Sequence, residues 1–239
     1  MRFVYGPVIS RRIGVSLGIS LTPYKICNFD CIYCQLGRTR EKTNVRKEYI
    51  ASGEIIDEVR AWISANKQEE AKLNYLTISG LGEPTLNTGI GRIISEIKKI
   101  SGVPLAVITN ASYLNDKEVR SCLLSADLIV PSLDAASQEV FEKIDRPSAE
   151  VKLNDIIEGL VDLRKEYSGK IWLEVMLVSG VNDDIRHIKK LKETIDRIEP
   201  DKIQLNSPVR TTSEENVLPV ERAKLEKIKE ILGDRCEIV

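Results

Sequence analysis

Short apolar runs alternate along the chain with segments in which apolar residues recur at every third or fourth position. The runs are rich in Ile, Leu and Val, which is typical of strands that are buried on both faces of a sheet. This pattern predicts strands at residues 14–21, 73–79, 104–109, 127–133, 171–178 and 202–206.

The segments between these strands are amphipathic. Apolar stripes at helical spacing predict helices within residues 55–63, 90–100, 156–163 and 185–198. A last helix is expected to follow Pro219 and to stop at Gly233, because proline favours a helix start and glycine a helix end. Strict β–α alternation predicts an α/β fold with a parallel sheet and right-handed crossovers, either a partial barrel or a doubly wound sheet.

Composition changes this picture little. The chain has 239 residues, 42% of them hydrophobic and 30% charged, which suits a single folded domain over residues 1–239. A net charge of -1 gives no global basic field for nucleic acid, although a local patch could still bind it. We expect a cytoplasmic protein, because no run is apolar enough for a secretory signal or a membrane span, and an odd cysteine count suits disulfides poorly.

Three of the five cysteines, Cys27, Cys31 and Cys34, fall within the stretch CNFDCIYC. Cysteine binds metals as the thiolate. A structural zinc site needs four protein ligands, and neither the single histidine nor the two other cysteines is an obvious fourth. A [4Fe–4S] cluster held by three cysteines would instead keep one iron open. The spacing favours such a cluster, with zinc and chance clustering as alternatives.

A second motif, SGLGEP, directly follows the strand at 73–79, just as the cysteines follow the strand at 14–21. In a parallel barrel such loops open on the face where ligands bind. Gly80 and Gly82 would allow close approach of a ligand, and Glu83 could accept an ammonium group. An ordinary turn with a helix-capping acid is the plainer interpretation. Thr85 stands where a dinucleotide fingerprint needs glycine.

The two motifs together, CNFDCIYC and SGLGEP, resemble those of the radical S-adenosylmethionine (radical SAM) superfamily. The resemblance covers the whole chain and implies a partial (β/α)6 TIM-like barrel that uses a [4Fe–4S] cluster and S-adenosylmethionine. Residues 6–40 further resemble a small subgroup of iron–sulfur oxidoreductases related to the tRNA wyosine-base synthases. The reaction so implied is reductive cleavage to a 5′-deoxyadenosyl radical, which takes hydrogen from an unidentified substrate. The electron would come from a carrier such as ferredoxin or flavodoxin.

The resemblance also implies roles for individual residues. Cys27, Cys31 and Cys34 match the cluster ligands, Tyr33 matches an aromatic residue that lies against adenine, and Gly82 with Glu83 matches the site of the methionyl amino group. The motif reads G-L-G-E rather than G-G-E, so Gly80 is an alternative to Gly82. Further contacts to S-adenosylmethionine are expected at strand ends and within strands, from Asn110, Ser132, Asp134, Glu174, and Gln204 or Asn206. No residue is expected to act as a catalytic acid or base.

Other conspicuous residues have plainer interpretations. The basic loop at 38–47 is expected to be solvated, with phosphate binding by an RNA or nucleotide substrate as the alternative. His187 is expected on an exposed helix face, Cys122 in the core, and Cys236 without a role. The substrate could be a small molecule, a peptide or an RNA base. A non-catalytic metal-binding module remains the alternative class, and too few cysteines remain for the second cluster that the wyosine-base synthase reaction would need.

Overall fold

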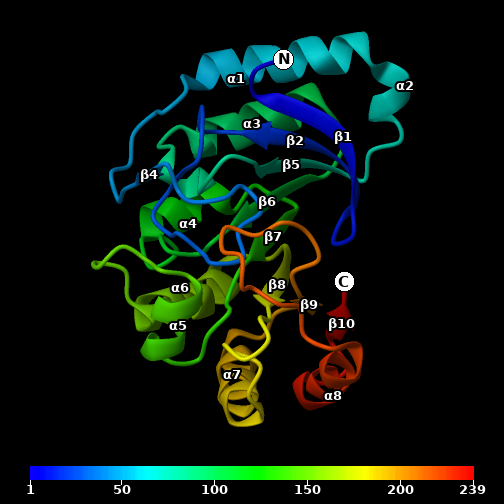
Figure 1. Cartoon of the computed structure of the whole chain (residues 1–239). Helices are drawn as coiled ribbons and strands as arrows, with labels where there is room; N and C mark the ends of the chain where they lie inside the picture. The colour runs from blue at the N-terminus through cyan, green and yellow to red at the C-terminus, as the bar shows by residue number, and fades with distance from the viewer.

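The computed structural model describes residues 1–239, and its main feature is an eight-stranded sheet in the order β1-β2-β5-β6-β7-β8-β9-β10 (Figure 1). All six strands predicted from the apolar runs are present and pair in parallel. They are β2 (Gly14–Ser20), β5 (Tyr75–Ser79), β6 (Leu105–Thr109), β7 (Leu128–Pro131), β8 (Lys170–Met176) and β9 (Lys202–Asn206). The chain thus forms a partial (β/α)6 barrel.

The predicted parallel sheet carries one additional, antiparallel strand at its edge, which the sequence did not indicate. The amino-terminal strand β1 (Val4–Ser10) pairs with β2 in antiparallel register, because a short turn joins the two strands and only antiparallel neighbours can be joined so closely. Five of its seven residues are exposed, so β1 has no buried apolar run from which it could be predicted. At the other edge, β10 (Cys236–Ile238) pairs in parallel with β9.

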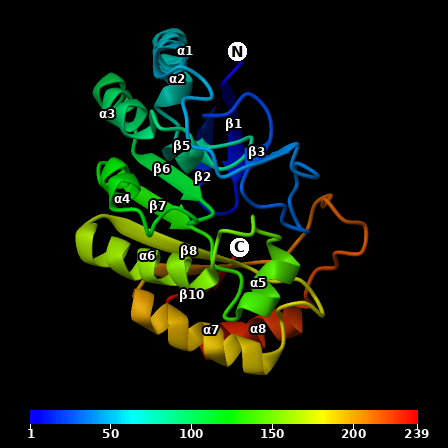
Figure 2. The same ribbon diagram turned by 90° about the vertical axis from the view of Figure 1, so that its left-hand side faces the viewer.

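Helices cover the outer face of the sheet, as Figure 2 shows. The predicted ones are α1 (Ser52–Ala65), α3 (Ile90–Ile100), α6 (Leu153–Glu166), α7 (Ile185–Ile198) and α8 (Arg222–Leu232), and α8 ends at Gly233. Shorter elements are α2 (Lys67–Glu70), η1 (Pro84–Leu86), α4 (Lys117–Leu123) and α5 (Gln138–Ile144). No helix has the length and apolar character needed to cross a membrane.

The two faces of the sheet have different chemistry because successive side chains of a strand point to opposite sides. Leu17 and Ile19 of β2 belong to the main apolar core, which is shared with the helices. Ser16, which precedes Leu17 and points to the other face, hydrogen-bonds Thr77 of β5 at 2.5 Å. This inner face also carries a small apolar cluster that contains Ala106 and Leu128. Polar side chains on the inner face therefore come from several strands.

The two edges of the sheet approach each other at the β1–β2 turn. In Figures 1 and 2 the tip of this hairpin lies beside the end of β10. The Arg11 guanidinium donates to the Val239 carbonyl at 3.2 Å, and the Gln204 amide donates to the Arg12 carbonyl at 2.8 Å. The turn therefore spans the gap that six parallel strands leave in the barrel.

Candidate active site

The three clustered cysteines lie in a loop that is closed at its base. We call residues 27–34 the cysteine loop. Its first residue ends β3 (Ile26–Cys27), which pairs in parallel with β4 (Glu41–Lys42). Inside the loop, the Cys34 amide donates to the Cys31 carbonyl at 3.1 Å and the Gly37 amide donates to the Cys34 carbonyl at 3.2 Å. These turns gather three thiols on one short segment after β2.

Other parts of the chain hold the cysteine loop in place. The Ile32 amide donates to the carbonyl of Ile144, the last residue of α5, at 2.9 Å. The Ser213 hydroxyl, from the segment after β9, donates to the Cys31 carbonyl at 2.8 Å. Figure 2 shows the segments after β3 and β9 on the same side of the molecule. The loop is thus fixed by contacts that are distant in sequence.

Gly82 fastens the second motif to the cysteine loop. Its backbone pairs with Ile26, and the Glu83 amide donates to the Ile26 carbonyl at 3.0 Å. Gly82 has φ of 129°, and a Cβ at this position would overlap the Ile26 carbonyl oxygen. Only glycine satisfies both conditions. This backbone contact between Gly82 and Ile26 therefore places the Glu83 carboxylate next to the cysteine loop.

Glu83 is buried, with 2% of its surface exposed, and its carboxylate is held by four donors. Oε1 accepts from the Thr85 amide and hydroxyl and from the Thr109 hydroxyl, while Oε2 accepts only from the Asn110 amide at 2.7 Å. Burial raises the pKa of Glu83 above its usual value. The capping interpretation is confirmed, because Glu83 is the N-cap of η1. Its Oε2 still has lone-pair capacity for another donor.

Tyr33 lies between two buried carboxylates. Its hydroxyl donates to Asp134 and lies 3.3 Å from Oδ1 of Asp145, which also accepts from the Cys31 thiol at 3.2 Å. Burial raises the pKa of both acids, that of Asp145 to about 7. Asp145 is a neighbour of the cysteines that the sequence did not indicate. The contact follows from α5, whose carboxyl end docks on the cysteine loop.

Four of the expected contacts to S-adenosylmethionine surround one small cavity of about 30 Å³ beside the cysteine loop. They are Tyr33, Asn110, Ser132 and Asp134. Asn28, which the sequence analysis also missed, is fully buried and accepts from the Asn110 side chain at 2.8 Å. Its only signal in the sequence is a polar residue directly after Cys27. The structure therefore unites this part of the predicted site.

Glu174, Gln204 and Asn206 form a separate polar group with the β1–β2 turn. Arg12 pairs with Glu174 at 2.5 Å, and the Asn206 amide donates to the same carboxylate at 3.1 Å. Gln204 Oε1 is buried and has no hydrogen-bond partner. These residues lie on β8 and β9, and they contact the turn rather than the cysteine loop. Arg12 is thus a neighbour of the expected site that no pattern in the sequence indicated.

Two of the plainer interpretations need correction. His187 is buried, with 8% of its surface exposed, because it lies beside Ile188 on the inward face of α7. Cys236 was expected to have no role, but it belongs to the main core as part of β10. Cys122 packs against that core at partial burial, in line with the prediction.

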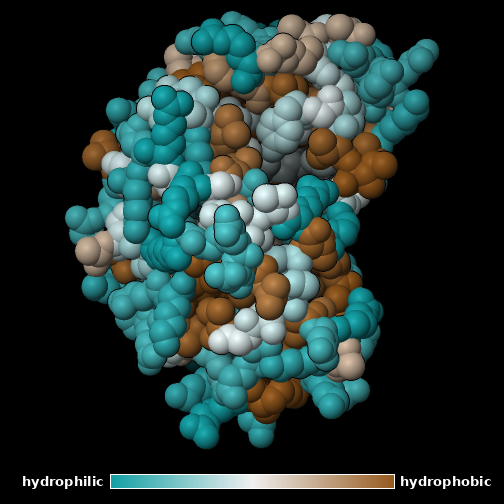
Figure 3. All heavy atoms as spheres, viewed as in Figure 1, coloured by the Kyte–Doolittle hydropathy of each residue, from teal (hydrophilic) through white to brown (hydrophobic).

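The basic loop at 38–47 is exposed, but its charges are engaged within the chain. Arg38 pairs with Glu214 at 2.8 Å, and Arg46 donates to the Thr85 carbonyl at 2.9 Å. Lys47 lies over the ring of Tyr49. In Figure 3 hydrophilic side chains gather over β4 and the adjoining loop. A solvated loop that is anchored to its surroundings describes this segment best.

The chemistry of the cysteine loop fits an iron–sulfur cluster. Cys27 Sγ accepts from the Phe29 amide at 3.3 Å and from the Asn110 side chain at 3.6 Å, and such donors favour a thiolate. Burial, followed by the charge of Glu83, raises the pKa of Cys27 to about 12, so a cation is needed to ionise it. A [4Fe–4S] cluster takes three cysteine thiolates on different irons, and the three thiols of one closed loop fit that ligand set.

Residues 21–198 match the radical SAM superfamily, which is about three quarters of the chain. The chain belongs to this superfamily. Members of the superfamily are enzymes that use a [4Fe–4S] cluster and S-adenosylmethionine. The fold prediction and the cofactor prediction are thereby confirmed at the level of the family.

Two related proteins match this chain over all or nearly all of its length. It is 35% identical over 239 residues to a UPF0026 protein of Methanocaldococcus jannaschii, spanning all of this chain and 73% of that protein. It is also 38% identical over 235 residues to a protein of Brachyspira hyodysenteriae named GTPase Obg. That match spans 98% of this chain but only 34% of the longer protein.

Solved structures agree on the fold. A radical SAM methyltransferase from Sphaerobacter thermophilus superposes with a TM-score of 0.70 at 15% identity, over 94% of this chain and 65% of that one. The structure of TYW1 with a lysine-pyruvate adduct gives a TM-score of 0.65 at 21% identity, over 91% of this chain and 72% of that one. At these identities the likeness concerns the fold alone.

Proposed function

We propose that this chain binds a [4Fe–4S] cluster through Cys27, Cys31 and Cys34 and reductively cleaves S-adenosylmethionine, so that a 5′-deoxyadenosyl radical abstracts hydrogen from a substrate. The observation that carries the proposal is the closed cysteine loop fastened by Gly82 to a buried glutamate. Both ends of the chain contribute strands to the same sheet, which supports a single functional unit over residues 1–239.

The chain's own contribution to the cluster is to supply and orient the thiolates. Cys27 would be the best stabilised of the three, because two N–H donors already point at its sulfur. Asp145 holds the Cys31 thiol by a hydrogen bond, and that proton would leave when iron binds. When bound, the cluster supplies the electron that splits S-adenosylmethionine into methionine and the 5′-deoxyadenosyl radical.

The residues around the small cavity would position S-adenosylmethionine. Glu83 would accept its amino group through Oε2, which has a single protein donor. Asn110 and Ser132 line the cavity and would contact the carboxylate or ribose, and Tyr33, held by Asp134, would lie against the adenine. Either Gln204, with an unpartnered buried oxygen, or Asn206 would complete the adenine contacts. No side chain is required to move a proton.

The proposal implies two further participants. The electron would come from a reduced one-electron carrier such as ferredoxin or flavodoxin. The hydrogen donor would be a small molecule, a peptide or an RNA base. A non-catalytic metal-binding module is the competing class, and it would need the cysteine loop without any site for S-adenosylmethionine.

Cluster content and ligand binding separate these two classes. After anaerobic reconstitution we expect one [4Fe–4S] cluster per chain, and we expect added S-adenosylmethionine to change the electron paramagnetic resonance spectrum of the reduced cluster. Cys31→Ala should lose the cluster, whereas the control Cys122→Ala, in a cysteine outside the loop, should keep it. If a protein with a full cluster gave the same spectrum with and without S-adenosylmethionine, that result would contradict the proposal.

A further inference from the structure

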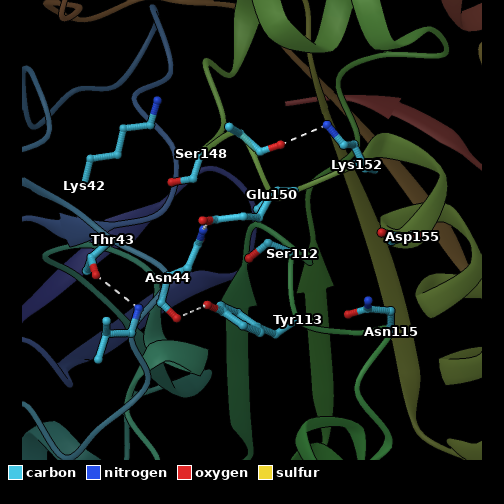
Figure 4. A pocket seen from close by; sticks show the side chains of 13 residues that line it. Lys42, Thr43, Asn44, Ser112, Tyr113, Asn115, Ser148, Glu150, Lys152 and Asp155 are labelled. Carbon is cyan, nitrogen blue, oxygen red and sulfur yellow. Dashed lines mark hydrogen bonds between the residues drawn. The ribbon is translucent and has the colours of Figure 1, made fainter.

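A second cavity lies beside the cysteine loop but outside the candidate site (Figure 4). Its volume is about 900 Å³, within the range of small-molecule sites. Its walls come from the segment that leaves β4, the loop after β6, and the connection between α5 and α6. None of the residues proposed to hold the cluster or S-adenosylmethionine lines it.

This cavity adjoins Cys27 through Asn28 and through Lys42 and Thr43, which pair with the Cys27 backbone. The Asn28 side chain donates to the Ser112 hydroxyl at 2.8 Å, and its carbonyl accepts from the Ser148 amide at 2.8 Å. Both serines line the large cavity. An occupant would therefore sit next to the cysteine loop without entering it.

Two lysines of the cavity have no carboxylate partner. The Lys42 ammonium donates to the Pro147 carbonyl and the Lys152 ammonium donates to the Ala149 carbonyl, each at 2.9 Å. Because these carbonyls flank Ser148, the two ammoniums approach the same short segment from its two sides, as Figure 4 shows. Two ammonium groups without a carboxylate partner suit one phosphate group.

The rest of the cavity suits a flat heterocycle. The ring of Tyr113 forms part of its wall, and the Tyr113 hydroxyl is fixed on the Asn44 carbonyl at 2.6 Å. Aromatic rings stack on nucleobases of every kind. The carboxylates of Glu150 and Asp155 also line the cavity and would repel further phosphates.

We propose that this cavity binds a nucleoside monophosphate unit, either free or within a single RNA strand, with its phosphate between Lys42 and Lys152 and its base against Tyr113. The site goes beyond the proposed S-adenosylmethionine chemistry and does not depend on it. It can therefore be tested by binding alone, and a failure here would leave the proposed radical reaction untouched.

The test measures binding of the four ribonucleoside 5′-monophosphates, of ribose 5-phosphate and of a short single-stranded RNA to the full chain by titration calorimetry. We expect the nucleotides to bind more tightly than ribose 5-phosphate because of the base. Tighter binding of the RNA would identify a strand as the source of the unit, and equal binding would identify the free nucleotide. No binding of any probe, or equal binding of ribose 5-phosphate, would overturn the proposal.

Variants locate the site. Lys42→Gln combined with Lys152→Gln should weaken binding at least about tenfold, since each substitution removes a charged donor to phosphate. Lys47→Gln is the matched control, because Lys47 is exposed in the same basic loop but does not line the cavity. If the control weakens binding as much as the double variant does, the attraction is diffuse and the site is refuted.

Discussion

At Gly82 the backbone of the glycine–glutamate motif touches the backbone of the cysteine loop. This contact decides which glycine of the motif is indispensable for the local structure. Gly80 also has a positive φ, but the neighbour of its Cβ position would be the small side chain of Ser20. At Gly82 the neighbour is the Ile26 main chain, which cannot rotate away.

Gly82→Ala should therefore destabilise the protein by at least about 2 kcal/mol, through a strained φ and a displaced Ile26. Chemical denaturation of the cluster-free protein measures this. The control Gly53→Ala, in the first turn of α1, places its Cβ in open space and should leave the stability unchanged or slightly raised. Equal stability of the Gly82→Ala protein would show that the contact does not hold the cysteine loop.

Single residues also mark the limit of what the sequence could predict. Cysteine spacing predicts a ligand set because the three residues share one segment. Asp145 reaches Cys31 from the end of α5, and Asn28, inside the cysteine loop, is buried through its contact with Asn110. Such roles depend on packing between distant segments, which no local pattern reveals.

At the level of elements, periodicity predicted the six parallel strands and the five longer helices. It missed β1, which is exposed, the short helices α2, α4 and α5, and the strands β3, β4 and β10, which are only two or three residues long. Nor does any local pattern show that the β1–β2 turn carries Arg11 and Arg12 to β8 and β9.

The β1–β2 turn places Arg12 beside Glu174, and the Arg12 cation balances the charge of this buried carboxylate. Arg12→Gln would leave a carboxylate that is 6% exposed without its cation, and it should cost about 3 kcal/mol of unfolding free energy. The double variant Arg12→Gln with Glu174→Gln should recover most of that loss, because no charge then remains buried. Urea denaturation of the single and double variants measures the coupling.

Arg197→Gln serves as the control for this pair. Arg197 and its partner Glu158 are both about half exposed, so their ion pair should contribute less than about 1 kcal/mol. If the double variant were as unstable as Arg12→Gln alone, the turn would be held by its backbone contacts to Gln204 rather than by the ion pair.

At the scale of the whole molecule, one sheet brings three polar regions to the ends of its parallel strands. The cysteine loop and its small cavity lie by β6 and β7. The β1–β2 turn with Arg12 lies by β8 and β9, and the large cavity lies beyond Asn28. We propose the first region for the cluster and most of S-adenosylmethionine, the second for a contact to its adenine, and the third for a nucleotide.

The central claim is that the cysteine loop supports reductive cleavage of S-adenosylmethionine. The most direct measurement is 5′-deoxyadenosine formed anaerobically by the reconstituted protein with dithionite and S-adenosylmethionine. We expect product from the full chain and from Cys122→Ala, and none when Cys27, Cys31 or Cys34 is changed to Ala. A protein that carries a full [4Fe–4S] cluster but neither forms 5′-deoxyadenosine nor binds S-adenosylmethionine at the cluster would contradict the claim.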